Sequence, residues 1–300
     1  MSESKFHPSG ASALTPKGPW AAKWVMARGV KTRYVEAGEG EPVILVHGAG
    51  PGAGGAFGFG MLIPVLAKHF RVIAIDLVGF GESDKPTNLM YSHQDHVNHL
   101  ADIVHALQLA PVKLVGNSWG AYVVTRFALD HPEKTDRVFQ IASGTIASAM
   151  GLSHNLTNLP GLKAFMAYDG TKQKLREFLE SILLTKPSDA LVDARHAMAS
   201  LPGAEAAHTA MRAFMKSMPN DPNLKQRFQI KDRLPAMTIP MQMVWGEKDA
   251  FAPVDFAHGL MKLLPNVRID LLSNAGHQAQ TDAPDEVNKL VLDFLLGKSA

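Results

Sequence analysis

The feature that most constrains this chain is a regular alternation between short apolar runs and longer segments with helical periodicity. Each run is rich in Val, Ile or Leu on both of its faces, as a strand covered by helices on both sides must be. Two earlier segments, KWVMA and KTRYVEAG, alternate more strongly and predict an antiparallel leading hairpin. We therefore expect an α/β fold with a mostly parallel eight-stranded sheet. The six parallel runs are PVILVHG, RVIAIDLVG, VKLVGNS, RVFQIASG, PMQMVWG and VRIDLLS.

Apolar side chains recur at helical spacing between the runs and predict helices with one face turned to the core. The first such stripe follows the second parallel run, and the last one closes the chain. We interpret both as packing surfaces and not as binding sites. The stripes consist of Val97, Leu100, Ile103, Val104 and Leu107, and of Val287, Leu290, Val291, Phe294 and Leu295.

The alternation stops between about Thr145 and Leu234, where the chain is helical in pattern, rich in Met and Leu, and interrupted by prolines. We predict a helical lid over residues 145–234, inserted after the sixth strand, a core formed by residues 21–144 and 235–300, and a flexible arm over residues 1–20. Large apolar lid side chains could pack against one another or line an adaptable pocket, and we expect three or four of them to reach a substrate. They are Met150, Phe165, Met166, Phe178, Met198, Met211, Phe214, Met215 and Met218.

The composition narrows the possible functions. The formal net charge of +2 comes from 30 basic and 28 acidic residues that are interspersed, so no basic stripe indicates nucleic-acid binding. Without cysteine the chain has no disulfide, thiol nucleophile or Cys-based metal site. It has no apolar run of about 18 residues, and its first residues lack the apolar core of a signal peptide. We expect a cytoplasmic protein that has no contact with membranes.

The stretch GNSWG, Gly116 to Gly120, follows an apolar run directly and precedes a helical pattern. A G-x-S-x-G turn between a strand and a helix lifts the serine hydroxyl above the sheet, while its glycines avoid collisions with the neighbouring strand and helix. The following helix directs its N-terminus at the reacting atom, where its dipole favours developing negative charge. We therefore predict that Ser118 is a nucleophile.

A serine nucleophile requires a histidine base and a carboxylate that orients it. His277 lies in the loop between the last strand and the last helix, and Asp249 follows the preceding strand in MVWGEKDAFAP. The carboxyl ends of parallel strands share one sheet edge, so both side chains should lie near Ser118. The order Ser118, Asp249, His277 is that of α/β-hydrolases.

Other histidines have structural explanations. His93, His96, His99 and His105 recur at helical spacing, and His131 ends a helix before a proline. The spacing in HQDHVNH would bring imidazoles onto one helix face, as a metal site requires, but no further ligand is identifiable. We expect no metal and no cofactor.

An oxyanion hole needs two backbone N–H donors near the incipient alkoxide. The Trp119 amide directly follows the nucleophile, and we predict Ala49, in the glycine-rich loop HGAGPGAGG, as the second donor. A phosphate-binding loop is excluded because no Lys-Ser or Lys-Thr pair follows, and no G-x-G-x-x-G opens a helix.

From about Lys23 to Leu296 these residues resemble the α/β-hydrolase family, and HGAGPGAGG with GNSWG resembles its meta-cleavage product hydrolases. These enzymes hydrolyse a carbon–carbon bond in vinylogous 1,5-diketones formed by aromatic ring cleavage. The resemblance implies that Asn117, Arg195 in ARHAMASLPGA and Gly50 contact the substrate. Arg195 would pair with its carboxylate and dienolate. An ion pair of Arg195 with Asp193, or a salt bridge within the lid, is the ordinary alternative.

Two positions depart from the family pattern. Gly58 stands where members usually carry an asparagine, and Gln278 stands where they usually carry a tryptophan after the histidine. Both family residues touch the dienoate. Their absence therefore leaves the identity of the substrate open. Carbon–carbon hydrolysis is the first hypothesis, an ester or lactone hydrolase the second, and a non-catalytic receptor for a small ligand the third. The resemblance also implies a homo-oligomer, a dimer or higher assembly.

Overall fold

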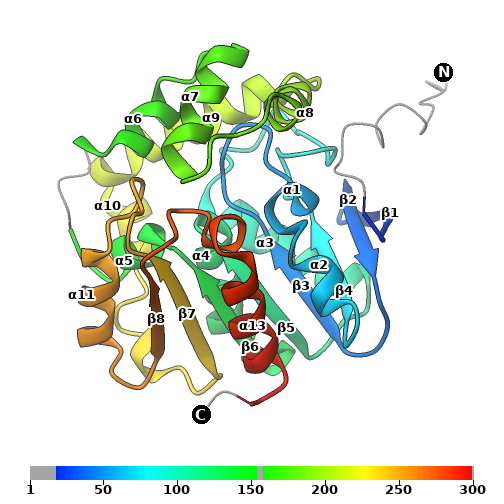
Figure 1. Cartoon of the computed structure of the whole chain (residues 1–300), viewed down its shortest axis with the longest axis vertical. Helices are drawn as coiled ribbons and strands as arrows, with labels where there is room; N and C mark the ends of the chain where they lie inside the picture. Colours follow the sequence, from blue (N-terminus) through cyan, green and yellow to red (C-terminus); the bar gives the residue numbers. More distant parts are fainter. Residues whose placement is uncertain (1–17, 154–157, 299–300) are drawn as a thin grey trace.

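The computed structural model of the protein describes residues 18–153 and 158–298, which fold around one eight-stranded sheet (Figure 1). The strands are β1 (Ala21–Ala27), β2 (Val30–Ala37), β3 (Pro42–Val46), β4 (Arg71–Ile75), β5 (Val112–Asn117), β6 (Thr135–Ile141), β7 (Met241–Gly246) and β8 (Arg268–Leu272). Their order is β1-β2-β4-β3-β5-β6-β7-β8. β1 and β2 form an antiparallel hairpin, β2 runs antiparallel to β4, and the other neighbours are parallel. The predicted hairpin and parallel runs are confirmed.

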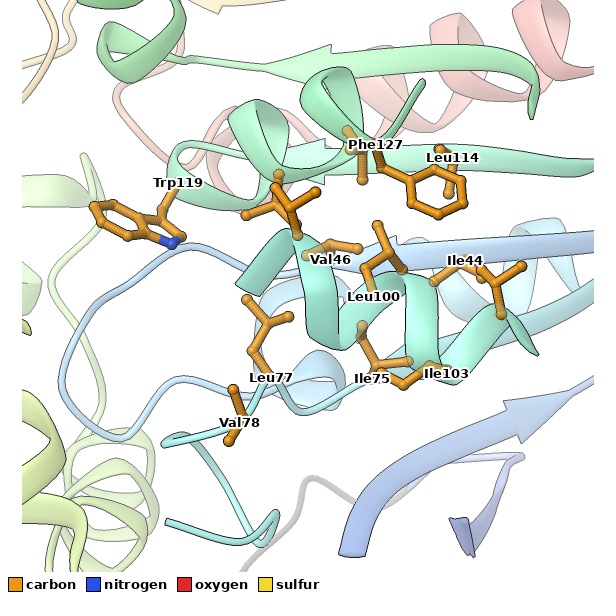
Figure 2. Close-up of a cluster of buried hydrophobic side chains, with 14 of the residues drawn as sticks. Ile44, Val46, Ile75, Leu77, Val78, Leu100, Ile103, Leu114, Trp119 and Phe127 are labelled. Carbon is orange, nitrogen blue, oxygen red and sulfur yellow. The ribbon is translucent and has the colours of Figure 1, made fainter. Parts of the chain in front are cut away.

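Helices cover both faces of the sheet, which explains why the parallel strands are apolar on both sides. In β3, Ile44 and Val46 pack with one set of helices, and Val43 and Leu45 pack with the other. Figure 2 shows the first of these clusters, in which Leu100 and Phe127 meet Ile44 and Val46. The first set contains α3 (His93–Ala106) and α4 (Trp119–Asp130); the second contains α1 (Gly55–Phe59), α2 (Ile63–Leu66) and α13 (Pro284–Leu295).

The two predicted apolar stripes lie in α3 and α13 and face the core. Val97, Leu100, Ile103 and Val104 are buried in α3, and Leu107, just beyond its end, is partly buried. In α13, Val287, Val291, Phe294 and Leu295 are buried, and Leu290 packs partly buried against them. His131 caps the C-terminus of α4 before Pro132, as predicted.

Further helices follow β6 and precede β7, at the place where the alternation stops in the sequence. In Figure 1, α6 to α9 stand above the upper edge of the sheet, where the parallel strands end. Prolines occupy the first position of α6 and α10, where the missing N–H of proline costs no helical hydrogen bond. The helices are α5 (Gly144–Ala149), α6 (Pro160–Met166), α7 (Lys172–Ile182), α8 (Asp189–Ala199), α9 (Ala204–Ser217) and α10 (Pro222–Phe228).

These helices have a small apolar cluster of their own, in which Phe165, Leu175, Phe178 and Leu179 are buried. A cluster of this kind lets the helices pack on one another as well as on the sheet. A lid with boundaries at residues 145 and 234 remains a prediction. Most of the predicted flexible arm, residues 1–17, lies outside the described residues. In the ranges that are described, no helix is long and apolar enough to span a membrane.

Candidate active site

Ser118 lies on a sharp turn between β5 and α4. Its backbone adopts φ 54° and ψ −116°, a conformation rare for a residue with a side chain. A Cβ atom on Gly116 would lie 2.5 Å from the Gly120 carbonyl oxygen, and one on Gly120 would lie 2.1 Å from the Val46 carbonyl oxygen. Both flanks of the turn therefore require glycine, and the turn presents the serine at the carboxyl edge of the sheet.

The structure brings Ser118, His277 and Asp249 together from three strand ends. His277 Nε2 lies 2.9 Å from Ser118 Oγ, and His277 Nδ1 lies 2.8 Å from Asp249 Oδ2. An ionised carboxylate only accepts hydrogen bonds, so Nδ1–H donates to Asp249, and in the neutral ring Nε2 is left to accept from the serine hydroxyl. This is the tautomer that a histidine needs in order to take a proton from serine.

The Asp249 carboxylate is itself held in place by backbone donors. Its Oδ1 accepts hydrogen bonds from the amides of Phe251 (2.8 Å) and Ala252 (2.7 Å). The Phe251 ring stacks on the His277 imidazole, with centroids 4.7 Å apart. This stack limits how far the imidazole can rotate. Phe251 was not among the predicted site residues, because no sequence pattern distinguishes it.

The predicted oxyanion donors are the amides of Ala49, in the loop after β3, and of Trp119, which follows the nucleophile directly. Both residues border the same cavity as Ser118, and a Cβ atom on Gly48, next to Ala49, would lie 3.2 Å from Ser118 Cβ. Within the described residues, neither amide donates to a backbone or side-chain acceptor. Their role as donors to an oxygen bound beside Ser118 stays a prediction.

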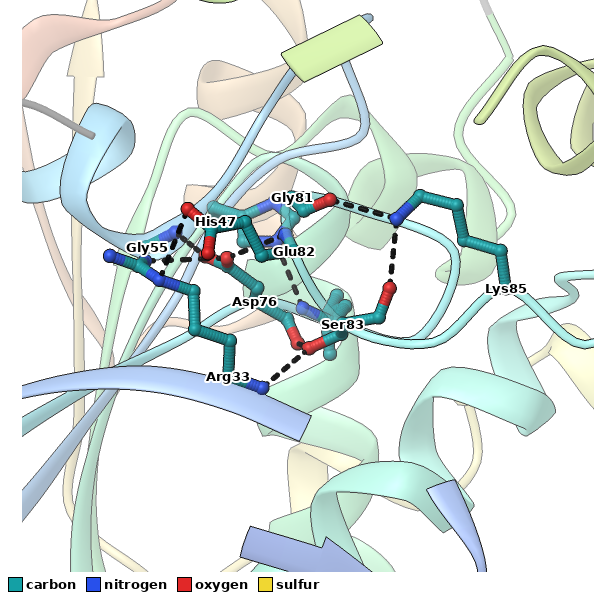
Figure 3. A network of polar contacts seen from close by, with 9 residues as sticks. Arg33, His47, Gly55, Asp76, Gly81, Glu82, Ser83 and Lys85 are labelled. Atoms are coloured by element: carbon teal, nitrogen blue, oxygen red, sulfur yellow. Dashed lines mark hydrogen bonds and ion pairs between the residues drawn. The ribbon is translucent and has the colours of Figure 1, made fainter. Parts of the chain in front are cut away.

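The loop that carries Ala49 is anchored by a buried carboxylate, Asp76, at the end of β4 (Figure 3). Asp76 Oδ1 accepts from the Gly55 amide (2.8 Å), while Oδ2 accepts from the Glu82 amide (3.1 Å) and from Arg33 Nη1 (3.3 Å). Because Gly55 begins α1, these bonds fix the far end of the glycine-rich loop against the loop after β4. Sequence reasoning missed this support, since an aspartate after a strand has no distinguishing pattern.

One cavity beside Ser118 is here called the polar cavity, because Asn117, Arg195 and Gln278 border it among apolar side chains, and it has a volume of about 60 Å³. All five predicted substrate contacts border it, although they come from separate parts of the chain. Asn117 is buried and donates from Nδ2 to the Ile141 oxygen (3.2 Å) and, at 3.4 Å, to the His277 oxygen. The five residues are Gly50, Gly58, Asn117, Arg195 and Gln278.

Arg195 is buried in the wall of the polar cavity, with 4% of its surface exposed. Its Nε and Nη2 donate to the Pro51 oxygen at 3.1 and 2.8 Å. Burial lowers the pKa of the guanidinium to about 10, so it remains charged at neutral pH. The alternative of an ion pair with Asp193 is wrong, because Asp193 pairs with Lys172 and both lie on the surface.

A Cβ atom on Gly58 would lie 3.2 Å from His47 Cβ, and the Gly58 backbone is bound by another side chain. Gln280 is buried and donates from Nε2 to the Gly58 oxygen at 3.2 Å. Its Oε1 has no hydrogen-bond partner among the described residues. The Gln278 amide donates to the Ile182 oxygen, which ties the loop of His277 to the end of α7.

A second, larger cavity, here called the apolar cavity, also borders Ser118 and has a volume of about 330 Å³. Of the nine Met and Phe side chains considered above, Phe165, Phe178 and Met215 border the polar cavity. Met166, Met215 and Met218 border the apolar one. Met198 and Met211 line a third cavity of about 460 Å³ that does not include Ser118, whereas Met150 and Phe214 belong to the core. Five of the nine thus lie beside the nucleophile.

The histidines of α3 are buried, except His105, which is exposed. His96 Nδ1 accepts from Trp119 Nε1 (3.0 Å), and His99 Nδ1 accepts from the Val78 amide (3.0 Å). His93 borders the apolar cavity, a position that its helical spacing did not predict. Within the described residues, no group of three or more His, Asp or Glu side chains could hold a metal ion.

A mostly parallel sheet with a serine after β5, an aspartate after β7 and a histidine after β8 is the arrangement of the α/β-hydrolase class of enzymes. The chain belongs to the alpha/beta hydrolase fold family, which it matches over residues 41–284. It is an enzyme of the hydrolase class, and its predicted resemblance to meta-cleavage product hydrolases is confirmed by the following relatives.

A 2-hydroxy-6-oxo-6-(2'-aminophenyl)hexa-2,4-dienoic acid hydrolase of Metapseudomonas resinovorans is 29% identical over 279 residues, 92% of this chain and 91% of that protein. A 2-hydroxy-6-oxo-2,4-heptadienoate hydrolase of Pseudomonas putida is 30% identical over 275 residues, 91% of this chain and 95% of that protein. The solved structure of a meta-cleavage product hydrolase from Pseudomonas fluorescens matches with a TM-score of 0.79 at 27% identity, covering 92% of this chain and 98% of that one.

Proposed function

We propose that the protein hydrolyses a carbon–carbon bond in a vinylogous 1,5-diketone, the meta-cleavage product of an aromatic compound. The observation that carries this proposal is the buried Arg195 cation in one of two cavities that meet at Ser118. A substrate with a carboxylate at one end and an apolar acyl group at the other would fill both cavities, with its scissile bond at the serine. The names of relatives at about 30% identity support the same reaction.

The first chemical step would be tautomerisation of the bound dienol to its keto form. Arg195 holds the oxo-acid end in the polar cavity, where the buried guanidinium stabilises the negative charge of the substrate. Because Asn117 Nδ2 already donates to the Ile141 and His277 oxygens, Asn117 holds this end through Oδ1, which can accept from the dienol hydroxyl. The keto form provides an electron sink conjugated with the bond to be broken. Without that sink, a carbon atom would be a poor leaving group.

In the second step Ser118 attacks the ketone farther from the carboxylate, and His277 takes the hydroxyl proton. The Ala49 and Trp119 amides donate to the resulting oxyanion. When the carbon–carbon bond breaks, His277 gives the proton it took from Ser118 to the leaving carbon, and the acyl group stays on Ser118. Water, deprotonated by His277, then releases the carboxylic acid, while Asp249 stabilises the imidazolium.

A pair of substrates tests this proposal in the wild-type protein. We expect a coloured ring-fission dienol to bleach and release a carboxylic acid stoichiometrically, with little turnover of a p-nitrophenyl ester. Release of p-nitrophenol without bleaching of the dienol would overturn it.

The second candidate is an ester or lactone hydrolase, which needs the same serine, histidine and amides but no tautomerisation. Gly58 and Gln278 favour it, because they border the polar cavity where related enzymes would place an asparagine and a tryptophan against the dienoate. The buried charge of Arg195 weighs against it, since a neutral ester has no carboxylate to pair with that charge.

A further inference from the structure

We propose that His93 selects the acyl group of the substrate, by forming a hydrogen bond with a hydroxyl or amino group on an aromatic ring bound in the apolar cavity. This inference rests on the proposed function. If Arg195 holds the carboxylate end in the polar cavity, the acyl half of the substrate enters the apolar cavity, whose wall contains His93.

The position of His93 is fixed by its neighbours. It is the first residue of α3, and the capping box of Ser92 and Asp95 fixes the backbone there. Its ring stacks on Trp119, the residue after the nucleophile, with centroids 3.8 Å apart and planes 17° apart. Phe228 and Tyr122 lie at 4.6 and 4.7 Å from the same ring. The imidazole is thus held beside Ser118 as part of the cavity wall.

Both ring nitrogens of His93 are buried and lack a hydrogen-bond partner among the described residues, and only 6% of the residue's surface is exposed. The next two histidines of α3 are equally buried but satisfied. His96 Nε2 lies 3.1 Å from the Val78 oxygen and its Nδ1 accepts from Trp119. His99 Nε2 lies 2.7 Å from Thr32 Oγ1 and its Nδ1 accepts from the Val78 amide. Of these three, the histidine without partners is the one at the cavity.

An unpaired imidazole in this position is unfavourable, and a phenyl ring would fill the aromatic stack without leaving polar atoms unsatisfied. Both nitrogens are buried where they lie, but a half-turn of the ring about its Cβ–Cγ bond exchanges each nitrogen with a carbon at almost unchanged shape, so a nitrogen can be turned toward a ligand in the cavity that His93 borders. A bound group that hydrogen-bonds this nitrogen would remove the penalty. The buried polar ring therefore indicates a polar group on the ligand.

The surroundings define the chemistry of that group. Burial lowers the pKa of His93 well below its usual value, so the ring is neutral and pairs with a neutral hydroxyl or amino group. Phe228, Phe251 and Phe256 provide flat apolar walls that suit an aromatic ring. Lys216 also borders this cavity, but it is exposed to solvent and therefore does not require an anionic group on the ligand. A neutral, substituted aryl group matches this cavity.

The test compares two dienoates that differ only in their acyl group, phenyl or hydroxyphenyl, with the wild-type protein and His93→Phe. We expect the wild type to prefer the hydroxyphenyl substrate by about tenfold in kcat/KM, the effect of one hydrogen bond. In His93→Phe the ratio of the two kcat/KM values should fall to about one. His93→Gln, which keeps a hydrogen-bonding group, should restore part of the preference. His105→Phe, an exposed change in the same helix, is the matched control and should leave the ratio unchanged.

Cleavage of both dienoates by the wild type without a preference would overturn the role of His93 while leaving the proposed function intact. An unchanged ratio in His93→Phe would also overturn it. If the wild type cleaved neither dienoate, the proposed function would fail and this inference with it. The comparison within the wild type holds even if His93→Phe does not fold.

Discussion

The buried charge of Arg195 lowers the stability of the folded protein and, in the proposed function, binds the substrate. Its guanidinium is buried, and its pKa of about 10 lies below the usual 12.5, because burial disfavours the charge. Since the pKa in the folded protein is lower than in the unfolded chain, the charge destabilises the native state at every pH below about 10. That penalty fades as the pH rises from 10 toward 12.5. A substrate carboxylate would offset it by supplying the missing anion.

We therefore predict opposite effects on stability and activity for Arg195→Met. Removing a buried charge without a carboxylate partner should raise Tm by about 2–4 °C in thermal unfolding at pH 7. The same variant should lose at least about a hundredfold in kcat/KM for a dienoate. A short 2-oxo acid should raise the Tm of the wild type but not that of Arg195→Met. Equal stabilisation of both proteins by the acid would contradict this role for Arg195.

At the scale of elements, the loop of His277 is tied directly to the helices above the sheet. Asp282, in α12 (Ala279–Asp282), accepts from the Gly276 amide at 2.9 Å and from the Leu184 amide at 3.0 Å. Gly276 precedes His277, and Leu184 follows α7. One carboxylate thus joins the loop that presents the histidine to the segment after α7, so a movement of that segment would reach the imidazole.

Asp282→Ala should loosen both segments. Losing these hydrogen bonds should lower the free energy of unfolding by about 1–2 kcal/mol and reduce kcat by roughly tenfold, because the His277 loop is held less firmly. Amide hydrogen exchange should accelerate at Leu184 and Gly276 together. Asp285→Ala, an exposed change at the start of α13, is the control and should leave these two amides unaffected. Faster exchange at only one of them would refute the coupling.

At the scale of the whole molecule, the leading hairpin, the parallel strands and the meeting of Ser118, Asp249 and His277 followed from the sequence, because they depend on patterns along the chain. Doubly buried runs predict parallel strands, and parallel strands end at one edge of the sheet. Features that depend on side chains from distant segments could not be predicted in this way. The Asp76 anchor, the stack of His93 on Trp119 and the contact of Gln280 with Gly58 join residues 21 to 222 positions apart.

The arrangement of the cavities could not be predicted from the sequence either. Helical spacing identified nine Met and Phe side chains, but not which of them border Ser118, because that depends on how the helices after β6 pack on one another. Arg195 was found by resemblance alone, and its burial emerged only from the fold. The two cavities at one serine are therefore the structural result on which the functional proposal depends.

The most direct test of that proposal is a single-turnover experiment with a coloured dienoate, in which free carboxylic acid is measured for the wild type and for Ser118→Ala. We predict that the wild type releases one acid per active site. Ser118→Ala should bind the dienoate but release acid on the order of a million-fold more slowly. Ser273→Ala, an exposed serine change, should match the wild type. Release of acid by Ser118→Ala at more than about a tenth of the wild-type rate would contradict nucleophilic attack by this serine.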